Sequence, residues 1–218
     1  MDMPFEYYFI ALSMLAGFVT LPRRKGPLYL RIFPFFLLVT LVTEIWAWEL
    51  ALKGITNTAH YNFISVTGCV FYLYILRHEI FLKRAKKIIL IIMISYVILS
   101  LYNIFFGQKI DSFHTMTYSL GCFLIVAVSI YYFYELFQVP RSIDLKREPA
   151  FWIVSGLLFF YVCTLPLLGV VNYLYTFPDI INAALEQLIT VLNVLLYSLF
   201  TIAFLCRINF KRFMLSSR

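Results

Sequence analysis

Seven long apolar stretches, separated by short polar segments, make up almost the whole chain. An α-helix rises about 1.5 Å per residue, so roughly 20 apolar residues cross the hydrocarbon core of a bilayer. The predicted spans are residues 5–21, 28–52, 59–82, 88–106, 112–137, 149–171 and 180–206. This pattern predicts an all-α membrane protein, a single seven-transmembrane-helix bundle that occupies residues 1–218.

The last span carries a row of polar side chains at helical spacing. Between Asp179 and Arg207 there is no Lys, Arg or Pro to interrupt the helix. At about 100° per residue, five polar positions fall within an arc of roughly 80° and extend for about 22 Å. They are Asn182, Glu186, Thr190, Asn193 and Tyr197, and the opposite face holds Ala184, Leu188, Val191, Leu195, Leu199 and Ile202. We therefore expect the polar face to meet protein or water and the apolar face to meet lipid.

The composition agrees with a membrane protein and excludes a soluble domain. Of the 218 residues, 62% are hydrophobic and only 13% are charged, whereas charged residues approach a quarter in soluble domains. Every loop is short, so the sequence holds no separate kinase, cyclase or ligand-capturing domain. Any function is expected to lie within the bundle or to pass through a partner.

The positive charges orient the predicted spans. Of the 18 Lys and Arg residues, 16 lie in or beside the loops after spans 1, 3 and 5 or in the C-terminal tail, and only Lys53 and Lys109 lie on the other side. The positive-inside rule then predicts an external N-terminus and a cytoplasmic C-terminus, in a bacterial inner membrane. The net charge of +7 is explained by this topology and by contact with the lipid bilayer, so no nucleic-acid partner is expected.

Two carboxylates inside the spans are candidates for a binding site. Glu44 and Glu186 each lie roughly 9 to 12 Å from the external end of a span, where a charged group is costly and is a functional candidate by default. A proton, a cation or a ligand amine would offset that cost. The alternative is a protonated or hydrogen-bonded Glu that joins two helices. With neighbours on the same faces, the candidate ligand-binding set is Glu44, Trp48, Tyr72, Asn182, Glu186, Thr190, Asn193 and Tyr197.

The sequence contains little that indicates catalysis or a cofactor. His60 and His114 lie at the external ends of spans 3 and 5 and could add a metal site, because His and carboxylate together suit zinc. No HxxH or HExxH spacing accompanies them, and histidines at a membrane interface need no metal. We expect no catalytic residues, so the sequence does not favour an enzyme. We expect no cofactor either. Span 7 has no Lys, which excludes a retinal Schiff base of the microbial rhodopsin kind.

The start of span 6 carries a resemblance to a known group of membrane modules. Residues Glu148 to Phe160 contain the pattern P-x-F-W-x-x-x-G-x-L-x-F. This stretch, with the seven-span plan, resembles uncharacterised seven-helix membrane modules of Bacteroidetes-type bacteria, which are often fused to, or encoded beside, a sensor histidine kinase. The resemblance implies a sensory role. Because this chain carries no kinase, it also implies a separate signalling partner.

Three functions remain open from the sequence. The first is a receptor or sensor module that binds a small or cationic ligand in an outward-facing intramembrane pocket and signals to a cytoplasmic or membrane partner such as a histidine kinase. The second is a small-solute or proton-coupled transporter, with Glu44 and Glu186 as coupling carboxylates. The third is an intramembrane hydrolase, for which the sequence shows no catalytic set.

Overall fold

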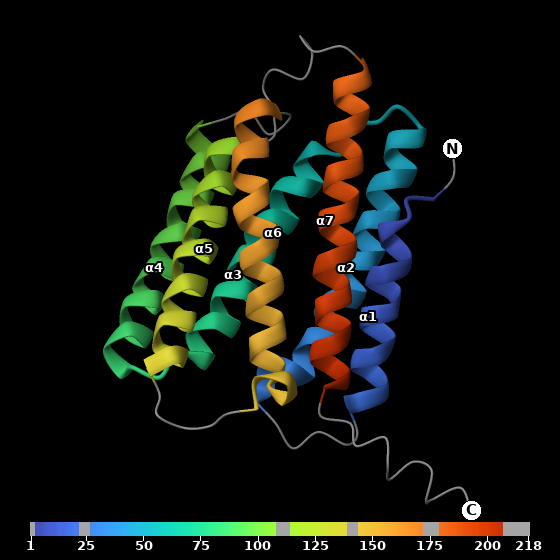
Figure 1. Ribbon diagram of the computed structural model, residues 1–218. Coiled ribbons are helices and arrows are strands. Elements are labelled where there is room, and N and C mark those ends of the chain that lie inside the picture. Colours follow the sequence, from blue (N-terminus) through green and yellow to red (C-terminus); the bar gives the residue numbers. More distant parts are fainter. Residues whose placement is uncertain (1–2, 22–26, 108–113, 139–143, 172–178, 207–218) are drawn as a thin grey trace, which may run out of the picture.

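The computed structural model describes residues 3–21, 27–107, 114–138, 144–171 and 179–206, and this part of the chain is built from helices and short turns without strands (Figure 1). The long helices are α1 (Glu6–Thr20), α2 (Leu28–Leu52), α3 (Thr58–Glu79), α4 (Lys83–Tyr102), α5 (Thr115–Gln138), α6 (Pro149–Val171) and α7 (Asp179–Leu205). A π-helical turn, Asn103–Gly107, continues α4, and a short 3₁₀ turn, Leu145–Arg147, precedes α6. The all-helical fold expected from the apolar pattern is therefore confirmed.

The helix bounds agree closely with the predicted spans except at the start of α5, which is Thr115 rather than residue 112, and around one turn. Helix α3 ends at Glu79, three residues before the predicted end of the span, and α4 begins at Lys83, five residues earlier than predicted. The prediction placed the cationic run in a loop because it counted apolar residues. Lys and Arg are good helix formers, however, and their long side chains can reach polar surroundings from a helix.

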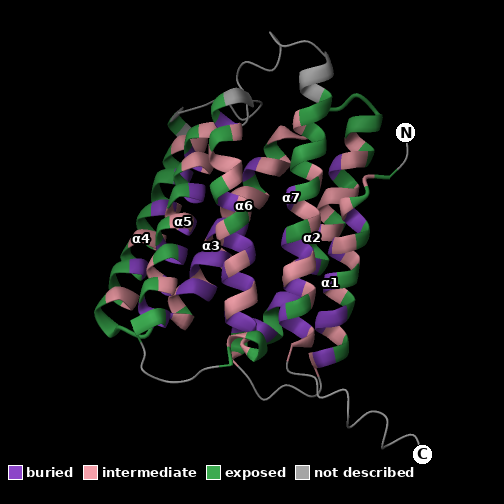
Figure 2. Cartoon of the chain, viewed as in Figure 1, coloured by how far each residue is buried: buried purple, intermediate pink, exposed green. Residues whose placement is uncertain are grey.

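Six helices of the described chain are long and apolar enough to cross a membrane, and the 15-residue α1 is apolar but shorter. The outside of the bundle is also apolar. On α4, for example, Ile88, Ile91, Ile94 and Ile98 are all more than half exposed. Figure 2 shows exposed positions along the outer faces of the helices and buried positions along their inner faces. Apolar helices with an apolar exterior are consistent with an integral membrane protein.

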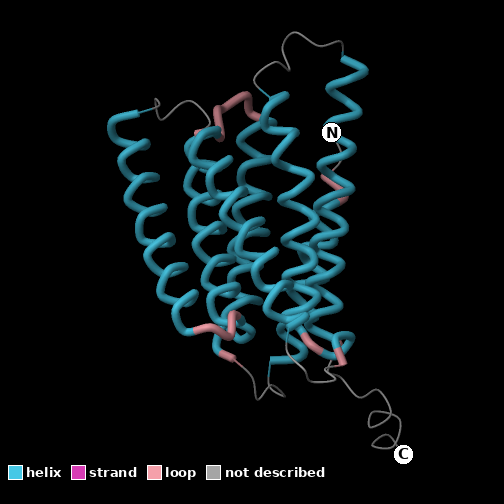
Figure 3. The backbone as a smooth tube through the Cα atoms, turned by 60° about the vertical axis from the view of Figure 1, so that its left-hand side comes forward, coloured by secondary structure: helices cyan, strands magenta, loops and turns pink. Residues whose placement is uncertain are grey.

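The helices form a ring with α4 on its outside. Helix α1 packs against α2 and α7, α7 packs against α6, α6 against α5, α5 against α3, and α3 completes the ring through its contacts with α2. Helix α4 contacts α3 and α5 and lies at the edge of the bundle (Figures 1 and 3). We call the end of the bundle at Glu6, Leu52 and Thr58 the upper end, and the end at Thr20, Leu28 and Glu79 the lower end, as in Figure 1.

The lower half of the ring is filled by aromatic side chains. Phe33 is fully buried, and its ring centroid lies 4.9 Å from that of Phe200 and 5.4 Å from that of Phe204. Beside them, a Cβ atom added to Gly17 on α1 would lie only 2.6 Å from Cγ of Pro34 on α2. Small residues let membrane helices approach closely, and here the glycine brings α1 against the start of α2.

Candidate functional site

The upper half of the ring encloses a cavity of about 410 Å³. Five helices contribute to its wall: α2, α3, α5, α6 and α7. Seven of the described lining residues are aromatic, namely Phe36, Tyr61, Tyr72, Tyr118, Phe160, Tyr161 and Tyr197. The volume falls within the range of about 300–1,000 Å³ that is usual for small-molecule sites, which are likewise mostly apolar with a few polar groups.

Glu44 is the single charged side chain among the described residues that line this cavity. The hydroxyl of Tyr61 donates a hydrogen bond to Glu44 Oε2 over 3.3 Å, and the hydroxyl of Tyr7 donates to the Glu44 backbone carbonyl over 3.1 Å. Glu6, at the start of α1, is close enough for its negative charge to act on Glu44. No Lys, Arg or His of the described chain pairs with the Glu44 carboxylate. The cavity therefore holds a carboxylate without a countercharge.

The cavity also holds uncharged polar groups that the protein leaves unpaired. The hydroxyls of Tyr72, Tyr161 and Tyr197 make no hydrogen bond within the described residues, although each residue is at least nine-tenths buried. The side-chain amide of Asn193 on α7 also lacks a partner in that part of the chain. By contrast, the lining hydroxyls of Thr40 and Thr164 donate to carbonyls of their own helices. Four polar side chains without a protein partner in the described chain thus line one cavity, where water or a polar ligand can pair with them.

The structure brings half of the predicted ligand-binding set together in this cavity. Glu44, Tyr72, Asn193 and Tyr197 all line it. Trp48 does not, and its half-buried side chain packs against the hydrophobic core. Asn182 lies in α7, but its side chain is outside the described residues.

Glu186 and Thr190 lie apart from the cavity. With Ala183, Gln187 and Val191 they line a separate depression on the surface of α7, and Glu186 is exposed. From Ala183 to Ile189 most α7 residues are exposed, because the top of this helix rises beyond its neighbours (Figures 1 and 2). Among the described side chains of the polar row, only Asn193 and Tyr197, in its lower part, meet the cavity in the bundle interior. On the opposite face, Leu188, Val191, Leu195 and Ile202 are each at least 40% exposed, as the sequence predicts for a lipid-facing surface. Leu199 departs from this prediction, because it is partly buried and packs beside Gly156 of α6.

The two candidate metal ligands, His60 and His114, do not line the cavity, and their contacts are with other parts of the fold. His60 Nε2 donates to the backbone carbonyl of Thr43 over 3.1 Å, and its ring packs against Trp46. His114 is buried, and its backbone N–H donates to Asn62 Oδ1 over 2.9 Å. Within the described residues no three His, Cys, Asp or Glu side chains gather closely enough to hold a metal ion.

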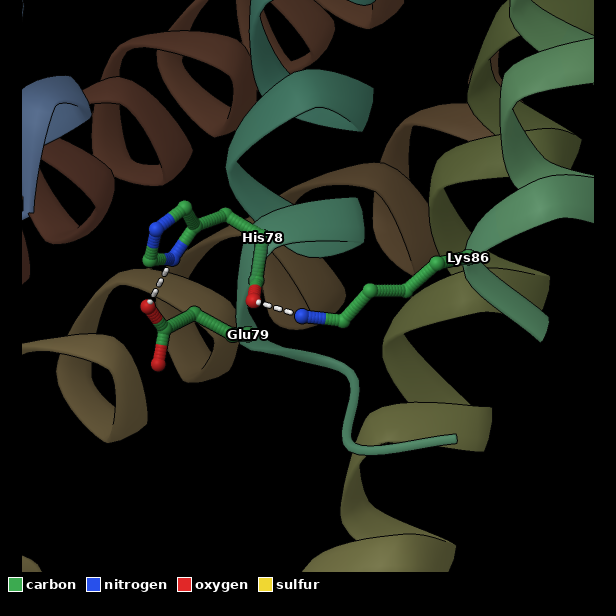
Figure 4. Close-up of polar contacts among 3 residues, drawn as sticks. All are labelled: His78, Glu79 and Lys86. Atoms are coloured by element: carbon green, nitrogen blue, oxygen red, sulfur yellow. Dashed lines mark hydrogen bonds and ion pairs between the residues drawn. The ribbon is translucent and has the colours of Figure 1, made fainter. Parts of the chain in front are cut away.

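At the lower end, the turn between α3 and α4 is held by several polar contacts. The Glu135 carboxylate of α5 accepts hydrogen bonds from the backbone N–H groups of Phe81 and Leu82, where α4 begins. Lys86 Nζ donates to the His78 carbonyl over 2.8 Å, and His78 Nδ1 lies 2.9 Å from Glu79 Oε1 (Figure 4). A carboxylate at a helix start satisfies N–H groups that lack a partner within the helix, so Glu135 fixes this turn to α5.

The sequence could reveal some of the remaining lining residues but not others. Tyr61, Ser65, Gly68 and Tyr72 share one face of span 3, and this spacing is visible in the sequence. The contribution of α6 is not visible in this way, because span 6 is apolar around its whole circumference and has no polar row. Tyr161 and Thr164 join the site only because the ring of helices turns that side of α6 inward.

Comparison with known proteins adds no further information. The chain matches no family model, no curated protein and no solved structure.

Proposed function

We propose that this protein is a membrane receptor or sensor module that binds a small or cationic ligand in the cavity and signals at the opposite face of the membrane. The cavity carries this proposal, because it occupies the upper half of the bundle while packed aromatic rings around Phe33 fill the lower half. A pocket closed on one side binds a ligand without offering it a path across the membrane. Glu44, Tyr72, Asn193 and Tyr197 are the ligand-binding residues in this proposal.

Helix α3 supplies the route for the signal. Its upper part contributes Tyr61 and Ser65 to the cavity, and Tyr72 follows closer to its lower end. That lower end leads directly into the turn held by Glu135 and Lys86. A ligand that binds one position of α3 better than another shifts the balance between the two positions. The α3–α4 turn would then move with the helix and present a changed surface.

The remaining parts of the proposal follow from the sequence. Under the positive-inside rule the upper end faces the outside and the lower end faces the cytoplasm, with seven spans including α1. The resemblance at residues 148–160 favours a separate histidine kinase as the partner at the lower end. A reporter fused after Arg218 is accordingly expected to be cytoplasmic.

Thiol labelling in membranes tests the pocket. Single cysteines are introduced by Asn193→Cys or Leu195→Cys in a chain whose four native cysteines are replaced, and a charged methanethiosulfonate reagent is added to one side of the membrane at a time. We expect Asn193→Cys to react only from the side of the N-terminus. Leu195→Cys is the matched control, since Leu195 is 41% exposed but on the lipid face, where a charged reagent does not reach.

The labelling result separates the proposed functions. Reaction of Asn193→Cys from neither side would contradict a water-accessible pocket. Reaction from both sides would favour the second candidate, a transporter with Glu44 as its coupling carboxylate, because alternating access exposes one site to each side in turn. That candidate draws its support from Glu44 being the one charged group of the described lining.

A further inference from the structure

We propose that the ligand of the cavity is an organic ammonium ion, with its charged nitrogen beside Glu44 and its apolar body among the aromatic rings. This inference rests on the proposed function, because it takes the cavity to be a ligand site. It adds the chemical class of the ligand and the orientation in which it binds.

The first argument is the unbalanced charge. Glu44 lies well inside α2, and the side-chain donors near its carboxylate are two neutral phenols: Tyr61, whose hydroxyl lies 3.3 Å away, and Tyr7. The nearby charge of Glu6 has the same sign and increases the imbalance. A carboxylate in apolar surroundings is stabilised only when a cation or several hydrogen-bond donors accompany it. The described chain provides no cation at this position. Either a proton on the carboxylate or a cation from outside the chain offsets the charge, and the adjoining cavity has room for an organic cation.

The second argument is the chemistry of the wall. Ammonium ions are attracted to the faces of Tyr and Phe rings within about 6 Å of the ring centroid. In the wall, the centroid of Tyr72 lies 5.6 Å from that of Phe36 and 6.1 Å from that of Tyr161. These rings can surround an alkyl or aryl body, while the Tyr61 ring, whose hydroxyl reaches Glu44, lies nearer to the charged nitrogen. An anionic ligand would meet the repulsion of Glu44 and the negative faces of the same rings.

The same wall argues against a bare metal ion. Ca²⁺ requires six to eight oxygen ligands, and zinc prefers several nitrogen, sulfur or carboxylate ligands. Around Glu44 the described structure offers one carboxylate and the hydroxyls of Tyr7 and Tyr61, and no set of three metal-ligating His, Cys, Asp or Glu side chains. An organic cation needs no such set, because one carboxylate and several rings suffice.

The unpaired groups of the cavity indicate a second polar group on the ligand. The Asn193 amide and the Tyr161 and Tyr197 hydroxyls line the cavity on α6 and α7, whereas Glu44 lies on α2. A hydroxyl, ether or carbonyl on the apolar body would pair with them, and water would do so for a ligand without one. The proposal thus requires an ammonium group on every ligand of the cavity, whereas the second polar group can differ between ligands or be replaced by water.

Binding to the full-length protein in lipid nanodiscs tests the charge preference. Three probes share one aromatic ring and differ in charge: 2-phenylethylammonium, 2-phenylethanol and 3-phenylpropanoate. We expect calorimetric titration to give at least tenfold tighter binding for the ammonium ion than for the alcohol, and the weakest binding for the carboxylate. Empty nanodiscs correct for partition of the probes into lipid.

Two variants test whether Glu44 is responsible for the preference for the ammonium probe over the alcohol. Glu44→Gln keeps the shape of the side chain and is expected to weaken ammonium binding at least tenfold, while alcohol binding stays within about twofold. Glu186→Gln is the matched control, because it makes the same change in an exposed carboxylate outside the cavity. It is expected to leave the binding of all three probes unchanged.

The outcomes separate this inference from the function on which it rests. Equal binding of alcohol and ammonium ion, an ammonium preference that survives Glu44→Gln, or no binding by any probe would overturn the ammonium class. The pocket itself would still stand if Asn193→Cys is labelled from one side. Loss of that labelling would overturn both proposals.

Discussion

The lower and upper halves of the bundle each contain a glutamate on a helix, and the two carboxylates differ in the hydrogen-bond donors around them. Glu135, near the lower end of α5, is 9% exposed and accepts two hydrogen bonds from backbone N–H groups at the α3–α4 turn. Glu44, in the upper half, has only the phenols of Tyr61 and Tyr7 as side-chain donors in the described chain, with Tyr61 at 3.3 Å, and faces a cavity. Both residues are glutamates, but backbone N–H groups donate to Glu135 and phenol hydroxyls to Glu44.

This difference separates a structural role from a functional one. Where the chain supplies the donors, the charged group joins two elements of the fold, as Glu135 does for α5 and the α3–α4 turn. Where the chain supplies few donors, the carboxylate lowers the stability of the fold but remains available to bind a ligand. The packing follows the same division, because aromatic rings fill the lower half and surround an open volume in the upper half.

The largest expected effect concerns the packed half. Phe33→Ala removes a fully buried ring that contacts the rings of Phe71, Phe200 and Phe204. At about 24 cal/mol per Å³ of cavity left behind, we expect a loss of about 2–3 kcal/mol of stability. Thermal denaturation in detergent measures it. Phe63→Ala is the control, since Phe63 is 68% exposed, and an equal loss there would show that the lower half is not specially packed.

A smaller loss is expected when the well-satisfied carboxylate is removed. Glu135→Ala leaves the Phe81 and Leu82 N–H groups without their acceptor and should lower stability by about 1–2 kcal/mol. Glu135→Gln keeps an acceptor oxygen and should lose less. Hydrogen exchange at the α3–α4 turn should rise in Glu135→Ala. Unchanged exchange at this turn would show that the carboxylate does not hold it.

The smallest effect on stability is expected at Glu44. Glu44→Gln removes a charge that the described chain does not balance, so stability without ligand should stay within about 0.5 kcal/mol of the wild type or rise. The same denaturation measurement tests it beside Glu135→Ala. If Glu44→Gln destabilises the protein as much as Glu135→Ala does, Glu44 joins helices after all, and the contrast between the two halves fails.

The fold class and most of the helix bounds could be predicted from the amino-acid sequence alone. Because backbone groups must be satisfied internally in a membrane, long apolar runs form helices, and α2 and α6 begin and end as predicted. The lipid-facing side of α7 and the choice of Glu44 as a candidate also follow from residue types and helical spacing. These properties are local, so they can be read without knowing which helices are neighbours.

Which polar residues lie together depends on how the helices pack, and the sequence pattern does not show this. Glu44 and Glu186 have similar depths within their predicted spans, yet α7 rises above its neighbours at Glu186 and leaves it exposed, while α2 presents Glu44 to a cavity. Tyr161 enters that cavity from a helix without any polar pattern. The reason is physical: spacing along a helix fixes the direction of a side chain relative to its own axis, but the height and rotation of the helix are set by packing against the others.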